Sequence, residues 1–228
     1  MRAWAVDRPA PIAQRPLVEV ARPVPSPGPD DVLVRVRACG VCRTDLHLAE
    51  GDLPPRHSGV VPGHQVVGEV ISVGRRAARF GVGDRVGIAW LRSTCGTCRW
   101  CRTGAENLCP SSAYTGWDAD GGFAEYMIVP RQVLKVDGLN RIPDGVGYDE
   151  ASAAEPFACA INAQELLGIE AGDTVVVFGA GPIGCMHIRI ARGVHRAGRV
   201  ILVDVNAARL KMSADAVSPD EVIDASEV

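Results

Sequence analysis

A glycine-rich turn between an apolar strand and a helix constrains the fold of this chain more than any other feature. Residues 173–178 (DTVVVF) suit a strand buried in a sheet, and 179–184 (GAGPIG) follow directly. A helix, a second apolar strand, another helix and a third strand are then expected at 183–193, 199–205, 207–216 and 221–224. This alternation predicts the first half of a parallel, doubly wound α/β sheet.

The glycine spacing indicates a dinucleotide site. Gly179 makes the turn, Gly181 lets a pyrophosphate approach the backbone, and Gly184 lets helix and strand pack closely. Asp204, at the end of the next strand, would accept hydrogen bonds from the ribose hydroxyls and repel a 2′-phosphate, which favours NAD over NADP. The predicted cofactor-binding residues of this half are Gly179, Gly181, Pro182, Ile183, Gly184 and Asp204.

Four of the eight cysteines are crowded into one short segment: Cys95, Cys98, Cys101 and Cys109. Such short spacings let four thiolates converge on one tetrahedral ion, with Gly96 between the first two allowing a tight turn. Because all four positions are sulfur, we predict a structural zinc site, with two disulfides or unliganded thiols as the alternatives.

The chain divides into two parts at about residue 150. Residues 1–150 predict a compact β-rich domain with long loops, and 151–228 a partial Rossmann domain. Strands are expected at 31–38, 65–73, 84–89 and 124–129. Residues 148–167 have the length of a helix, which Pro156 should break or kink.

Composition excludes several classes of function. A net charge of -3 over 228 residues, with scattered arginines, argues against a nucleic-acid surface. No apolar run approaches the roughly 20 residues of a membrane helix, and the N-terminus lacks the apolar core of a signal peptide. We therefore expect a cytoplasmic protein that acts on small molecules.

A second cluster of metal-ligating residue types lies nearer the N-terminus. A catalytic zinc needs three protein ligands and an open fourth position, and Cys42 and His64 could supply two of the ligands. On spacing alone, a buried cysteine and a core histidine are the favoured explanation of these residues.

Taken together, GVCRTDLH (40–47), Gly63-His64, the four cysteines, GDRV (83–86) and the glycine turn resemble the zinc-dependent medium-chain dehydrogenases. That resemblance implies a GroES-like catalytic domain before a Rossmann domain. A complete Rossmann domain has six strands, so we expect about 90 further residues and hence a truncated chain. Members of this family commonly form homo-oligomers through the later strands of the Rossmann domain. The resemblance therefore implies a homo-oligomer only for a chain that contains those strands.

The resemblance also implies roles for individual residues. Cys42 and His64 match ligands of the catalytic zinc, and Asp45 matches the carboxylate that orients the ligand histidine. Thr44 and His47 match the hydroxyl and imidazole that pass the substrate proton to solvent. Further matches are Arg43, near the cofactor pyrophosphate; Arg209, near the adenosine ribose; and Trp90, beside the alcohol pocket.

Two positions depart from the family pattern or leave it open. Gln65 stands where the family has glutamate after the ligand histidine, which removes a negative charge near the metal. The third zinc ligand is either Glu155, as in polyol and threonine dehydrogenases, or Cys159, and the alignment of the helix favours Glu155.

The expected function is reversible oxidation of an alcohol or polyol by NAD, with one catalytic and one structural zinc ion. Two alternatives differ in class. One is a truncated, non-catalytic fragment stabilised by the four-cysteine zinc site. The other is a nucleotide sensor that binds NAD without a catalytic metal.

Overall fold

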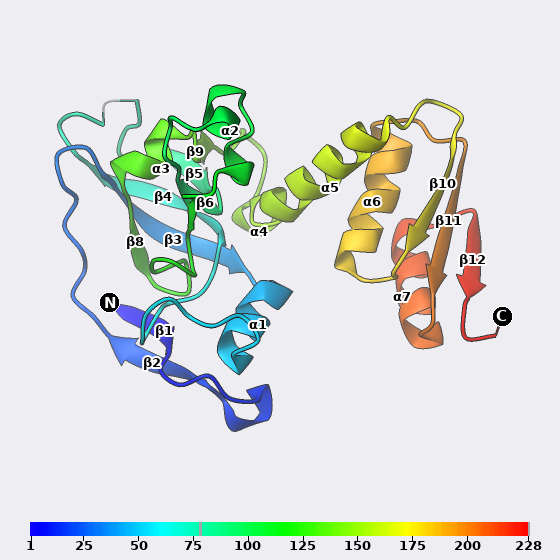
Figure 1. Ribbon diagram of the computed structural model, residues 1–228, viewed down its shortest axis with the longest axis horizontal. Helices are drawn as coiled ribbons and strands as arrows, with labels where there is room; N and C mark the ends of the chain where they lie inside the picture. The colour runs from blue at the N-terminus through cyan, green and yellow to red at the C-terminus, as the bar shows by residue number, and fades with distance from the viewer. Residues whose placement is uncertain (78, 228) are drawn as a thin grey trace. The chain divides into compact units, whose positions relative to one another are not determined.

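The computed structural model describes residues 1–77 and 79–227 (Figure 1). It contains two compact units, Met1–Ala154 and Glu155–Val228. Each unit has a hydrophobic core of its own, and the two are described separately below. In the part of the chain that the structure covers, no helix has the length and apolar character needed to cross a membrane.

The first unit is built on a five-stranded antiparallel sheet. Its strands, in spatial order, are β8 (Tyr126–Val129), β3 (Val32–Gly40), β4 (Gln65–Val73), β5 (Arg85–Ile88) and β9 (Leu139–Arg141). Val34, Val70 and Val86 are fully buried in the core beneath this sheet. β-Branched residues pack well on such a pleated surface, which explains why short valine-rich runs form the sheet.

Two small sheets and several short helices complete this unit. One sheet pairs β1 (Arg2–Val6) with β2 (Leu17–Ala21), and the other pairs β6 (Leu91–Ser93) with β7 (Ala113–Tyr114). The helices are α1 (Arg43–Glu50), α2 (Arg99–Arg102), α3 (Arg131–Lys135) and α4 (Tyr148–Ala151), with single 3₁₀ turns at Ile12–Gln14 and Glu106–Leu108. The sequence did not predict β1 or β2.

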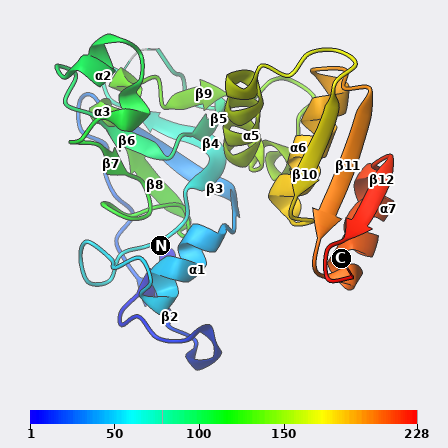
Figure 2. The ribbon, with the colours of Figure 1, turned by 45° about the vertical axis from the view of Figure 1, so that its right-hand side comes forward.

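The second unit is a parallel α/β half-sheet in the order β10 (Thr174–Phe178), β11 (Arg199–Asp204) and β12 (Glu221–Asp224). Helices α6 (Pro182–Gly193) and α7 (Ala207–Val217) connect the strands. Figures 1 and 2 show both helices on one side of the sheet, where Ile188, Leu202 and Leu210 form the core. A β-rich part followed by half of a doubly wound sheet is the fold class that the sequence predicted.

Two details of the chain after residue 147 differ from the sequence prediction. The helix expected at 148–167 is divided into α4 and α5 (Ala154–Leu167), so that Pro156 falls in the first turn of α5, where proline is tolerated. Val176 and Phe178 of β10 are 46% and 80% exposed. The described helices cover the opposite face of this strand, so β10 is not buried on both sides as its apolar sequence suggested.

Candidate functional site

The four clustered cysteines come together in the loop between β6 and β7. Within residues 1–77 and 79–227, Cys95, Cys98, Cys101 and Cys109 form the only group of three or more metal-ligating side chains whose donor atoms all lie within 4.8 Å of one another. Sγ of Cys101 lies 3.9 Å from Sγ of Cys95 and 3.5 Å from Sγ of Cys98. Sulfurs held about 2.3 Å from one tetrahedral zinc ion would be about 3.8 Å apart. The donor set and its spacing therefore fit zinc.

The backbone of this loop favours a thiolate at Cys95. Gly96 and Gly104 have φ angles of +70° and +77°, which let the chain turn back on itself. Sγ of Cys95 accepts hydrogen bonds from the backbone N–H of Cys98 at 3.3 Å and from the hydroxyl of Thr97 at 3.6 Å. Hydrogen bonds from the Thr97 and Cys98 backbones lower the pKa of the Cys95 thiol to about 6. The thiolate is the form that binds a metal.

Asp45 connects the two predicted zinc ligands of the first unit. Cys42 is the N-cap of α1, and its backbone N–H donates to Oδ2 of Asp45 at 2.8 Å. Oδ1 of Asp45 accepts from the backbone N–H of Gly63 at 2.9 Å and lies 3.6 Å from Nδ1 of His64. A carboxylate facing Nδ1 favours the tautomer whose lone pair is on Nε2, the ring atom that can ligate a metal. The imidazole is thus oriented as a zinc ligand requires, and the same carboxylate holds the backbone of Cys42.

Two aromatic side chains, Trp90 and Tyr114, lie in a row beside His64. The ring centroids of His64 and Trp90 are 5.5 Å apart, and those of Trp90 and Tyr114 are 4.4 Å apart. The buried indole N–H of Trp90 finds no hydrogen-bond partner among the described residues. The sequence pointed to Trp90 but not to Tyr114, which reaches this place because β7 pairs with β6.

The two predicted relay residues lie on α1. Oγ1 of Thr44 is 3.5 Å from Sγ of Cys42. His47, with 39% of its side chain exposed, places Nδ1 2.9 Å from Oδ2 of Asp52. Asp52 was not predicted, because it reaches His47 only through the left-handed turn at Gly51 that ends the helix. The Asp52 carboxylate fixes the imidazole ring and favours a proton on Nδ1.

Gln65 follows His64 in the chain, and Cys39 lies close to Asp45. Gln65 is buried at the start of β4 opposite Gly40, and a Cβ on Gly40 would lie only 2.2 Å from Oε1 of Gln65. Burial, together with the charge of Asp45, raises the pKa of Cys39 to about 12. The Cys39 thiol is therefore neutral, and it packs against the core of the sheet.

Both candidates for the third zinc ligand lie at the start of α5. Cys159 follows Glu155 by one helical turn, and its thiol donates to Oε1 of Glu155 at 3.5 Å. The two side chains therefore share one face of the helix. Glu155 is the first residue of the second unit, and the choice between the two ligands stays a prediction.

The glycine turn has the geometry that its sequence predicts. Gly179 has a φ of +107°, a conformation that favours glycine. A Cβ on Gly184 would lie 1.9 Å from the carbonyl oxygen of Gly179, whereas a Cβ on Gly181 would meet open space. Gly181 caps α6, and Pro182 and Ile183 follow in its first turn. The backbone in front of this helix N-terminus is thus open to an anion.

Asp204 lies beside this turn at the end of β11. Its carboxylate accepts hydrogen bonds from the backbone N–H groups of Ala180 at 2.7 Å and Asn206 at 2.9 Å. These bonds hold the pKa of Asp204 below its usual value. Nη1 of Arg209 lies 3.7 Å from Oδ2 of Asp204. Arg43, in the first unit, is exposed and makes no ion pair with a described residue.

Comparisons with known proteins show the family of the chain. Residues 28–138 match the family described as the alcohol dehydrogenase GroES-like domain. The chain is 44% identical over 233 residues to the probable alcohol dehydrogenase AdhA of Mycobacterium tuberculosis (strain CDC 1551 / Oshkosh), over 98% of this chain and 65% of that protein. The chain belongs to the medium-chain dehydrogenase family. A second medium-chain relative, the sorbitol dehydrogenase of Halalkalibacterium halodurans, is 36% identical over 91% of this chain and 58% of its own length.

Solved structures of the family have the same fold. A protein described as a zinc-binding dehydrogenase from Sinorhizobium meliloti 1021, bound to NADP, has a TM-score of 0.88 at 32% identity. A protein described as the short chain alcohol dehydrogenase rspB of E. coli CFT073, complexed with NADH, has a TM-score of 0.87 at 32% identity. Each match covers 100% of this chain and 62% or 63% of the solved one. The chain thus spans less than two thirds of the length of these solved relatives.

Proposed function

We propose that this chain carries the zinc and nucleotide sites of a dehydrogenase that transfers a hydride between an alcohol or polyol and NAD. Relatives named alcohol, sorbitol and L-threonine 3-dehydrogenase support an oxidoreductase that acts on hydroxyl groups. The single observation that carries the proposal is the Asp45 carboxylate, which contacts the Cys42 backbone, the Gly63 backbone and the His64 ring at once.

Two metal sites with different donors follow from this proposal. Cys42, His64 and Glu155 would hold a catalytic zinc ion, while Cys95, Cys98, Cys101 and Cys109 would hold a structural one. A zinc ion bound by three protein ligands supplies a Lewis acid that lowers the pKa of the substrate hydroxyl. Four sulfurs leave no position for a substrate, so the second ion would only stabilise its loop.

The substrate proton would leave along α1. The Thr44 hydroxyl lies beside Cys42 and can accept the proton of the substrate hydroxyl. His47 lies one helical turn further on and is partly exposed, so it can release that proton to water. Because Asp52 favours a proton on Nδ1, the lone pair of a neutral His47 is on Nε2, which would be the accepting atom.

The second unit would hold the cofactor through Gly179, Gly181, Pro182, Ile183 and Gly184. NAD supplies the hydride acceptor. The carboxylate of Asp204 is kept ionised beside the turn, where it suits two ribose hydroxyls and repels a 2′-phosphate. Arg209 would lie near the ribose and Arg43 near the pyrophosphate.

We assign residues 1–150 to the catalytic domain and 151–228 to the nucleotide-binding domain. The compact units meet within a few residues of that point, between Ala154 and Glu155. The partner would be a small alcohol or polyol in the cytoplasm, with no nucleic acid or membrane involved.

Zinc content and turnover test the proposal together. We expect two zinc ions per chain by atomic emission, and reduction of NAD at 340 nm with ethanol, sorbitol or threonine as the substrate. Cys42→Ser should lose one zinc ion and all activity, whereas Cys98→Ser should lose the other zinc ion. Glu155→Ala and Cys159→Ala, assayed for zinc in the same way, decide the third ligand.

Other results would favour the alternatives. One zinc ion that is retained in Cys42→Ser, with weak NAD binding and no turnover, would indicate the non-catalytic zinc fragment. Tight NAD binding without a second zinc ion would indicate a nucleotide sensor.

A further inference from the structure

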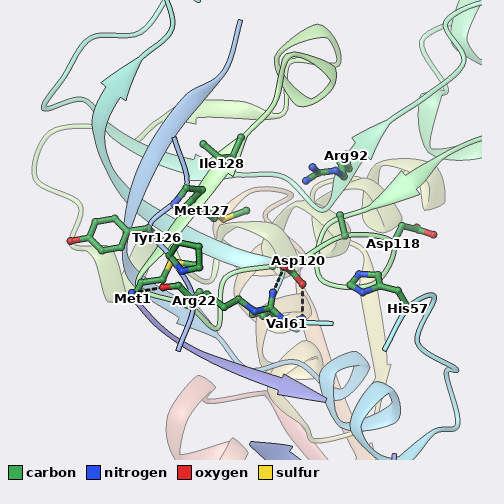
Figure 3. A pocket seen from close by; sticks show the side chains of 15 residues that line it. Met1, Arg22, His57, Val61, Arg92, Asp118, Asp120, Tyr126, Met127 and Ile128 are labelled. Atoms are coloured by element: carbon green, nitrogen blue, oxygen red, sulfur yellow. Dashed lines mark hydrogen bonds and ion pairs between the residues drawn. The ribbon is translucent and has the colours of Figure 1, made fainter. Parts of the chain in front are cut away.

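A cavity of about 470 Å³ lies in the first unit, apart from every predicted zinc, relay and nucleotide residue (Figure 3). It is formed by the chain after β2, the loop at 118–121 and strand β8. Val61, Met127 and Ile128 give it apolar walls. Its size and lining are those of a small-molecule site.

Both acidic residues of the cavity already have basic partners. Asp120 forms an ion pair with Arg22 and accepts the backbone N–H of Val61 at 2.9 Å. Asp118 lies 3.5 Å from Nε of Arg56. The two aspartates are therefore neutralised by other arginines.

Of the two arginines that line the cavity, Arg22 has such a partner and Arg92 has none among the residues that the structure covers. It lies on β6 and is only partly exposed, and its side chain makes no hydrogen bond or ion pair with any residue in the described ranges. Figure 3 shows its guanidinium directed toward the side of the cavity that Met127 and Ile128 form. Burial lowers the pKa of Arg92, and the carboxylates of Asp120 and Asp31, which form no ion pair with it, offset this effect only in part. An anion inside the cavity would compensate this charge.

We propose that this cavity binds a small organic monocarboxylate, with its carboxylate on Arg92 and its apolar body against Val61, Met127 and Ile128. A guanidinium pairs with a carboxylate through two parallel hydrogen bonds. One guanidinium without an ion-pair partner matches one negative charge. The apolar walls suit a hydrocarbon body and offer nothing to inorganic phosphate.

Benzoate and its neutral analogue benzamide test the charge requirement. Calorimetric titration of the purified chain should show saturable benzoate binding that is at least about tenfold tighter than benzamide binding. Arg92→Gln should abolish this difference. Arg75→Gln removes an exposed arginine outside the cavity and should leave the difference unchanged. Thermal unfolding of Arg92→Gln at or above the wild-type midpoint shows that the variant is folded.

Four results would overturn the inference. They are equal affinity for benzoate and benzamide, no saturation by about 10 mM, the same loss in Arg75→Gln as in Arg92→Gln, and tighter binding of inorganic phosphate than of benzoate. Benzoate on a zinc ion at Cys42 would instead be lost in Cys42→Ser and retained in Arg92→Gln. The inference therefore fails or holds separately from the proposed dehydrogenase.

Discussion

At the scale of single residues, the two glycines of α6 differ in the space that surrounds them for a side chain. Gly184→Ala places a Cβ 1.9 Å from the carbonyl oxygen of Gly179, whereas Gly193→Ala meets nothing within 4 Å. We expect the first change to lower the free energy of unfolding of the second unit by about 1–3 kcal/mol. The second should raise it by about 0.5–1 kcal/mol, because alanine is the better helix former. Urea unfolding followed by circular dichroism measures both, and a stable Gly184→Ala variant would contradict the packing described here.

A second prediction at this scale concerns Asp204. Asp204→Asn keeps a side-chain oxygen for the Ala180 N–H but removes the charge that faces the turn. NAD should bind about tenfold more weakly, since a hydrogen bond to a charged group is lost, and NADP should gain relative to NAD. Asp215→Asn, on the exposed side of α7, is the matched control. Calorimetric titration with both nucleotides measures the ratio, and tighter NADP binding by the wild type would refute the role of Asp204.

At the scale of elements, the four-cysteine loop has little apolar support. Neither α2 nor the 3₁₀ turn at Glu106–Leu108 contains a buried residue. Removing zinc with a chelator should therefore raise hydrogen exchange over 95–109 and leave the sheet β8-β3-β4-β5-β9 protected. Cys98→Ser should act like the chelator, and Cys185→Ser, in α6, should not. Unchanged exchange after chelation would show that the loop is held by packing.

The second unit should be sensitive to acid. The backbone N–H of Val200, with help from Arg192, lowers the pKa of Asp220. A carboxylate whose pKa is lower in the folded state stabilises the fold above its unfolded pKa of about 3.9, and this stability is lost as the pH falls through the folded value. Stability should therefore decrease below about pH 4, and Asp220→Asn should decrease less steeply than the control Asp215→Asn. Identical pH profiles for the two variants would exclude this contribution.

The elements also show what a sequence can predict. Local apolar patterns predicted β4 and every strand of the second unit within about a residue, because each βαβ connection there joins neighbours along the chain. β1 was missed, since it depends on distant contacts such as Trp4 with Phe123. The contact of Asp52 with His47 was missed for the same reason, and so was the position of Arg92 in the cavity. Both depend on how the backbone folds.

At the scale of the whole molecule, the division after Ala154 has a spectroscopic consequence. The first unit contains all four tryptophans and all three tyrosines: Trp4, Trp90, Trp100, Trp117, Tyr114, Tyr126 and Tyr148. Near-ultraviolet absorbance and intrinsic fluorescence therefore report only on that unit, while far-ultraviolet circular dichroism also records α5, α6 and α7. We expect the two signals to give different urea midpoints, and coincident transitions would mean that the units unfold together. A melting temperature taken from fluorescence alone therefore describes only the first unit.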